Sequence, residues 1–259
     1  MKQKKHRAFN ILGNIAIVNF PKDWKKTQKI NFAKKLLKDN NVLKTVLEKS
    51  SKVKGRLRKL ETRWLVGEKT KEVLYKENGC VFRFNIDTTY FSPRLSNERK
   101  EIAKKIRKAE SVLVMFAGVA PYPIVIAKNS KVGKVVSNEI NRKANKYAKL
   151  NTELNKVKNK IEFWDGNIKR IKKREKFDVI VMPRPQLKDS FLKEAFRFSK
   201  TGTRIFYYDF CEVGKEKEVV EKIKNEAKKA RKKIRVLKIK RAGEIAPYKI
   251  RLRVDFKII

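Results

Sequence analysis

The spacing of apolar and polar residues changes near residue 96, and this change divides the chain into two predicted regions. In the first region, a stripe of apolar residues at helical spacing covers residues 26–40. Gly13 lies between two short apolar runs, which predicts a hairpin or bent strand over residues 11–18. Further short segments are expected at 42–47, 59–67, 71–76 and 81–86. The pattern therefore predicts a small α+β module over residues 1–95.

From residue 97 onward, short apolar runs that predict strands alternate with longer stretches of helical periodicity. Helices are expected at 98–108, 122–128, 142–155, 189–198 and 214–231. Strands are expected at 112–116, 133–138, 160–164, 178–182, 203–209, 235–240 and 249–257. Only a loop separates the last two strands. The order predicts an α/β domain over residues 96–259, in which a closing antiparallel hairpin completes the seven-stranded, Rossmann-like sheet of class I methyltransferases.

The charge of the chain is strongly unbalanced. Lys and Arg number 69 against 27 Asp and Glu, which gives a formal net charge of +42 over 259 residues. Adaptation to high temperature would explain many lysines, but it would not explain so few acids. An electric field of this sign attracts nucleic acid and makes the binding salt-dependent. The composition therefore favours a polyanionic partner.

Cysteine, histidine and hydropathy limit the remaining classes. Cys80 and Cys211 lie far apart without metal-ligand spacing, so two buried thiols are expected and a disulfide stays open. His6 is the only histidine, which argues against a zinc cluster, and no metal is predicted. No run approaches the roughly twenty apolar residues of a membrane span, and no signal peptide opens the chain. A cytoplasmic protein without a membrane partner is expected.

Two positions suggest a nucleoside pocket. The apolar run at 112–118 ends in Gly118, and the next apolar run ends in Glu139. In a doubly wound sheet, such a glycine lets the backbone approach a nucleoside, and the carboxylate accepts hydrogen bonds from ribose hydroxyls. A glycine turn alone more often serves packing. Together, the two positions predict a nucleoside cofactor.

Five segments have the order and spacing of a known family: 91–99 (FSPRLSNER), 115–118 (MFAG), 139–141 (EIN), 182–185 (MPRP) and 207–208 (YY). They resemble the archaeal tRNA (guanine-37-N1)-methyltransferase family. The resemblance covers residues 8–259 and implies S-adenosylmethionine as the cofactor. It implies that the substrate is the purine immediately 3′ to the anticodon, in the anticodon loop of tRNA.

The resemblance also implies roles for individual residues. Guanine N1 carries a proton near neutral pH, so its methylation requires a base and a cation or donor near O6. Glu98 matches the general base of the family and Arg58 its positively charged partner. A plain alternative for Glu98 is a carboxylate that is favoured at a helix N-terminus. The implied cofactor-binding residues are Arg99, Phe116, Gly118, Glu139, Gly166 and Asn167.

The chain departs from the family pattern at Pro183, where most members have asparagine. Proline offers neither a polar side chain nor a backbone N–H to the target base. Together with Pro185, it resembles the wyosine-pathway subgroup, which methylates C7 of 4-demethylwyosine and in some cases also guanine N1. This implies tRNA-Phe as the partner. The alternative is that Pro183 merely ends a strand.

Other functions stay open at this point. One alternative is an aminocarboxypropyl transferase of the wyosine pathway, although its loop differs from residues 92–95 (SPRL). Another is a non-catalytic RNA-binding protein, which the intact Glu98, Gly118 and Glu139 disfavour. The chain begins almost directly at the central module of the family, so tRNA binding is expected to depend on charge, and a monomer is expected.

Overall fold

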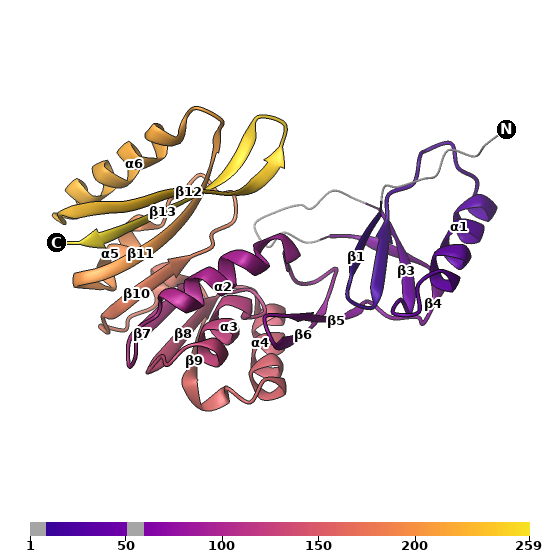
Figure 1. Cartoon of the computed structure of the whole chain (residues 1–259), viewed down its shortest axis with the longest axis horizontal. Coiled ribbons are helices and arrows are strands. Elements are labelled where there is room, and N and C mark those ends of the chain that lie inside the picture. Colours follow the sequence, from indigo (N-terminus) through magenta and orange to yellow (C-terminus); the bar gives the residue numbers. More distant parts are fainter. Residues whose placement is uncertain (1–8, 51–59) are drawn as a thin grey trace. The chain divides into compact units, whose positions relative to one another are not determined.

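The computed structural model describes residues 9–50 and 60–259, which form two compact units with a break between Pro93 and Arg94 (Figure 1). The break lies two residues before the boundary predicted between residues 95 and 96. From the sequence we also expect tRNA binding by residues 1–95 and S-adenosylmethionine binding by residues 96–259, and both assignments stay predictions.

The first unit is the predicted α+β module. Its four-stranded sheet has the order β1-β2-β3-β4, in which β2 and β3 are parallel and the other neighbours antiparallel. A separate hairpin pairs β5 with β6. The elements are β1 (Phe9–Leu12), β2 (Ile15–Val18), α1 (Lys26–Lys38), β3 (Thr45–Lys49), β4 (Thr62–Gly67), β5 (Glu72–Glu77) and β6 (Cys80–Asn85).

The turn between β1 and β2 requires glycine. Gly13 has φ +58, and a Cβ at this position would lie 2.0 Å from the carbonyl oxygen of Leu74. Only glycine permits both the left-handed backbone and this close approach to β5. The hairpin that the sequence predicts about Gly13 is confirmed. The strand predicted from residue 42 begins only at Thr45, because the Leu43 N–H closes a turn onto the carbonyl of Asn40.

The second unit is a seven-stranded sheet with the order β12-β13-β11-β10-β7-β8-β9. All neighbours are parallel except β13, which is antiparallel to both β11 and β12. The class I methyltransferase fold with its closing hairpin is thus confirmed. The strands are β7 (Ser111–Met115), β8 (Lys134–Glu139), β9 (Ile161–Asp165), β10 (Phe177–Met182), β11 (Ser199–Glu212), β12 (Ile234–Ala246) and β13 (Lys249–Ile258).

Helices cover both faces of this sheet (Figure 1). Helix α2 packs against α3, and α5 packs against α6. Tyr207 belongs to the core formed with α5 and α6. The ring of Tyr208 instead packs against that of Tyr122 on α3, with 6.1 Å between the ring centroids. Successive residues of a strand point to opposite faces, so the two layers lie on opposite sides of β11. The helices are α2 (Ser96–Lys105), α3 (Pro121–Asn129), α4 (Arg142–Leu154), α5 (Leu192–Arg197) and α6 (Glu216–Lys229), and the short 3-10 turns are η1 (Pro93–Leu95), η2 (Lys158–Lys160) and η3 (Ile168–Arg170).

Several sequence expectations need correction. The helix expected at 189–198 begins only at Leu192, because Phe191 has φ 56. Both cysteines are free thiols, and only Cys80 is buried, since Cys211 is half-exposed. Within the described ranges, no helix is long and apolar enough to cross a membrane.

Candidate active site

Most of the predicted site residues lie at the carboxyl edge of the second unit's sheet, whereas Glu98 and Arg99 come from α2. Met115 pairs with Asn138 across β7 and β8, and Met182 pairs with Tyr207 across β10 and β11. The residues that follow, including Phe116, Glu139 and Pro183, therefore share one edge. In open α/β sheets, ligands bind outside this edge.

The carboxylate of Glu139 fixes the turn that follows β7. Its Oε2 accepts a hydrogen bond from the N–H of Gly118 at 2.8 Å, and its Oε1 accepts one from the N–H of Asn141 at 2.8 Å. Phe116, Gly118 and Ala120 all have φ between 60 and 65. Left-handed backbone at non-glycine residues clusters at functional sites. The turn is therefore strained, and Glu139 holds it in place.

Asn138, which sequence reasoning missed, ties the second turn of the edge to the third. Its Nδ2 donates to the carbonyls of Trp164 at 2.7 Å and Gly166 at 3.1 Å. The Gly166 N–H donates to the carbonyl of Glu139 at 2.7 Å. Asn167 caps η3 by accepting a hydrogen bond from the Lys169 N–H at 3.2 Å. The sequence signal that could have identified Asn138 was an amide residue at the end of an apolar run.

This geometry fits the nucleoside part of S-adenosylmethionine. A carboxylate has about four acceptor sites, so its orientation by two backbone amides is compatible with recognition of ribose hydroxyls by Glu139. Phe116 adds a half-buried ring, which packs edge-on against Phe191 with 5.0 Å between centroids. The edge thus has one oriented acceptor and one aromatic surface.

Glu98 lies at the centre of a buried polar cluster on the α2–α3 face. Its Oε2 accepts from the Tyr208 hydroxyl at 2.9 Å and from Arg253 Nη1 at 2.5 Å. Its Oε1 accepts from Lys240 Nζ at 2.7 Å. The side chain of Arg253 is fully buried. The structure therefore gives Glu98 more than a helix-terminus role, because its carboxylate joins α2 to three strands.

Arg253 also binds the two carboxylates that flank Glu98 in the cluster. Its Nη2 donates to Glu101 at 2.6 Å, and its Nε donates to Asp255 at 2.7 Å. The hydrogen bond from Arg253 lowers the pKa of Glu101 to about 2, with burial opposing and Lys240 assisting. Burial raises the pKa of Tyr208 well above its usual value, so the phenol keeps the proton that it donates to Glu98. We call Glu98, Glu101, Tyr208, Lys240, Arg253 and Asp255 the Arg253 cluster.

Comparison with known families decides the class of the chain. The TRM5/TYW2 methyltransferase domain matches residues 73–237, and the TYW2 N-terminal domain matches residues 1–70. The chain belongs to the TRM5/TYW2 methyltransferase family. The resemblance seen in the sequence and the methyltransferase class are confirmed.

Three relatives illustrate how closely this family is matched. The tRNA (guanine(37)-N(1))/4-demethylwyosine(37)-methyltransferase Taw22 of Nanoarchaeum equitans is 33% identical over 97% of this chain and 100% of its own length. The crystal structure of Trm5b from Pyrococcus abyssi matches with a TM-score of 0.86 and 33% identity, over 98% of this chain and 75% of that one. A complex of aTrm5 with tRNALeu matches with a TM-score of 0.83 and 29% identity, over 97% and 72%.

The other predicted family residues are placed as follows. Arg99 is buried on α2, with its guanidinium 5.8 Å from the centre of the Tyr122 ring on α3. Pro183 and Pro185 are half-buried beyond β10, on either side of the buried Arg184. Arg58 lies outside the described residues.

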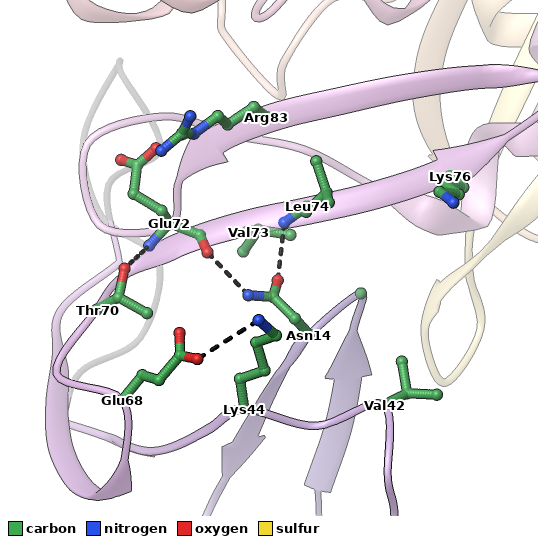
Figure 2. A pocket seen from close by; sticks show the side chains of 11 residues that line it. Asn14, Val42, Lys44, Glu68, Thr70, Glu72, Val73, Leu74, Lys76 and Arg83 are labelled. Atoms are coloured by element: carbon green, nitrogen blue, oxygen red, sulfur yellow. Dashed lines mark hydrogen bonds and ion pairs between the residues drawn. The ribbon is translucent and has the colours of Figure 1, made fainter.

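The first unit has a surface hollow of its own. The cavity measures about 570 Å³, and none of the predicted site residues that the structure describes lines it. Figure 2 shows Asn14 reaching the backbone of β5, where it donates to the Glu72 carbonyl at 3.3 Å and accepts from the Leu74 N–H at 2.7 Å. In its lining, Lys44 pairs with Glu68 and Arg83 pairs with Glu72. These four charged side chains therefore have partners within the first unit.

Proposed function

We propose that the chain transfers the methyl group of S-adenosylmethionine to the purine at position 37 of tRNA, at guanine N1 and also at C7 of 4-demethylwyosine. The observation that carries this proposal is the Glu139 carboxylate, oriented by two backbone amides beside the strained Gly118 turn. We infer that the partner is the anticodon loop of tRNA-Phe and that the chain acts as a monomer.

The cofactor supplies an electrophilic methyl group, and the chain orients it. We assign the ribose to Glu139 and the adenosine surroundings to Phe116, Gly118 and the turn at Gly166 and Asn167. Arg99 supports the same edge from α2. The target purine must then leave the stack of the anticodon loop to reach the methyl group.

Two observations support the dual base specificity. Taw22, whose name gives both activities, matches this chain over its whole length. Pro183 stands at the carboxyl edge beside the turn of residues 116–120, which we call the cofactor turn. Its side chain offers no hydrogen bond to a base edge, and it has no backbone N–H. Apolar space of this kind suits a tricyclic ring and gives guanine no preference.

Mass spectrometry of nucleosides tests the proposal. The enzyme is incubated with S-adenosylmethionine and either unmodified tRNA-Phe or tRNA-Phe that carries 4-demethylwyosine. One added methyl on each base is expected, whereas the mass of an aminocarboxypropyl group would support the alternative transferase.

Pro183→Asn should shift the ratio of the two single-turnover rates by about 1–3 kcal/mol in transition-state terms, because it adds a polar contact. An unchanged ratio would reduce Pro183 to a strand terminator.

We retain Glu98 as the proton acceptor for guanine N1. An N1 nucleophile must lose its proton as it attacks, whereas a C7 carbon can attack first and release its proton later. Glu98→Gln should therefore slow guanine methylation by roughly 10²- to 10⁴-fold and slow 4-demethylwyosine methylation less. Glu101→Gln is the matched control, because Glu101 lies on the same helix as Glu98 and contacts the same two cations, Lys240 and Arg253. Equal losses on both bases in Glu98→Gln would remove its assignment as the base.

A basic segment between β9 and β10 supports RNA as the partner. Residues 169–176 contain six cations and one acid, and the segment leads away from the Gly166 turn at the carboxyl edge. With Lys172, Lys173 and Arg174 replaced by glutamine, the affinity for tRNA should fall less steeply with salt. The magnitude of the slope of log affinity against log salt should decrease by about 2, since each phosphate contact contributes roughly 0.7–0.9. Lys228, Lys229 and Arg231, exposed at the end of α6, form the control triple. Equal slope changes in both triples would mean that binding depends only on net charge.

A further inference from the structure

The loop that carries Pro183 and Pro185 folds around one buried cation. Residues 183–191, between β10 and α5, contain neither helix nor strand. Arg184 stands between the two prolines, and its side chain is only 1% exposed. A guanidinium is rarely buried unless it is paired. The contacts of Arg184 therefore explain how an irregular loop keeps one shape.

Arg184 closes the loop onto itself. Its Nη2 donates to the carbonyl of Leu187 at 2.7 Å and to the carbonyl of Asp189 at 2.9 Å. The planar fork of arginine can bind two such acceptors while its other nitrogen binds a carboxylate, a geometry that lysine cannot reproduce. The residues after Pro185 are thus held by the residue before it.

Arg184 is anchored to the sheet through Asp209. Its Nη1 donates to Asp209 Oδ1 at 2.8 Å. The same carboxylate accepts from the Tyr207 hydroxyl at 2.9 Å and from Lys222 Nζ at 2.6 Å. Burial raises the pKa of Tyr207, so its hydroxyl stays a donor. We call Arg184, its two carbonyl acceptors at Leu187 and Asp189, and Asp209 the clamp. The clamp is therefore fixed to β11 and α6, on the face of the sheet opposite the Arg253 cluster.

The far end of the loop reaches the cofactor turn. The Asp189 carboxylate accepts from the Phe191 N–H at 2.8 Å. Phe191 is buried with a left-handed backbone, and its ring contacts Phe116, which is also left-handed. Such conformations persist only where the surroundings fix them. The contacts run without a break from Asp209 through Arg184 and the loop to the turn at Phe116.

We propose that Arg184 is a positioning residue for methyl transfer. It holds Pro183 and Pro185 in one place at the carboxyl edge, and through Phe191 it holds that edge against the cofactor turn. Its Nε has no hydrogen-bond acceptor among the described residues. The three hydrogen bonds of the two Nη groups therefore determine where the guanidinium lies. The target base then meets a wall of fixed shape. This inference rests on the proposed function, because that function supplies the base.

Single-turnover methylation of both tRNA substrates tests the proposal in Arg184→Met, Arg184→Lys and Arg204→Met. Arg204 is the matched control, because its side chain is 16% exposed and also binds one carboxylate and a backbone carbonyl, but at the amino end of β11. Arg184→Met should lose roughly ten- to a hundredfold in rate, as expected for a misplaced site, and should change the ratio between the two bases. The concentration that half-saturates the single-turnover rate should stay within about twofold, because binding to tRNA depends on charge. Arg184→Lys should recover part of the rate.

Hydrogen exchange of the backbone amides of residues 186–191 tests the clamp without any substrate. Arg184→Met should lose protection there, whereas Arg204→Met should keep it. Unchanged exchange and an unchanged rate ratio in Arg184→Met would overturn the inference, as would equal rate losses in Arg184→Met and Arg204→Met. If the wild type methylates neither base while exchange in Arg184→Met rises, the proposed function fails and the clamp stands.

Discussion

Replacement of Arg253 by methionine is expected to lower the free energy of unfolding by about 3–5 kcal/mol, because removal of one partner leaves buried charges without compensation. Arg253 binds Glu98, Glu101 and Asp255 from a fully buried position. Urea denaturation at neutral pH measures the change. Methionine fills a similar volume, so the loss reports the ion pairs more than a cavity.

Arg241→Met serves as the control for this prediction. Arg241 also comes from the closing hairpin and binds Glu216 at 2.8 Å, but its side chain is 60% exposed. An exposed ion pair contributes about 0–1 kcal/mol. A loss in Arg253→Met no larger than that in Arg241→Met would mean that water reaches the Arg253 cluster and screens it.

Replacement of Glu139 by alanine is expected to weaken binding of S-adenosylmethionine by about 1–3 kcal/mol, because the ribose hydroxyls lose a charged acceptor. The N–H groups of Gly118 and Asn141 lose their acceptor as well, so the cofactor turn relaxes. Isothermal titration calorimetry with S-adenosylmethionine measures the affinity.

Asp178→Ala is the matched control for Glu139→Ala. Asp178 is likewise a carboxylate on the sheet that accepts a backbone N–H of the neighbouring strand, from Ser111 at 2.9 Å, but at the amino edge. This variant should bind the cofactor as the wild type does. Unchanged affinity in Glu139→Ala would show that the carboxylate only supports the turn.

The alternation of apolar runs and helical stretches predicted the second unit well, because each strand of a parallel sheet is buried on both faces and gives a continuous apolar run. The order of the last two strands then predicted the closing hairpin. Glu139 and Gly118 could be predicted because both follow directly from strands. Their mutual hydrogen bond could not, since it depends on side-chain orientation across 21 residues.

The Arg253 cluster could not be predicted from the pattern of β13. Residues 249–255 alternate charged and apolar side chains, which indicates one face in water. The structure buries Arg253 and Asp255 instead, because α2 covers this face and brings Glu98 and Glu101 to it. A local motif in the sequence identified Glu98, but the two cations that bind it, Lys240 and Arg253, lie 142 and 155 residues away along the chain. Arg184 escaped notice for a similar reason, since charge within a loop usually indicates exposure.

The closing hairpin has a consequence for the order in which the molecule assembles during synthesis. Both cations that hold Glu98 come from β12 and β13, with sequence separations of 142 and 155 residues. At roughly 5–20 residues per second, about 7–28 s pass between synthesis of α2 and of Lys240. Glu98 and Glu101 lie one helical turn apart and repel each other during that time. The carboxylates of α2 therefore gain their cation partners on β12 and β13 only after the hairpin has been synthesised and has paired, so the Arg253 cluster is among the last parts of the nascent chain to form.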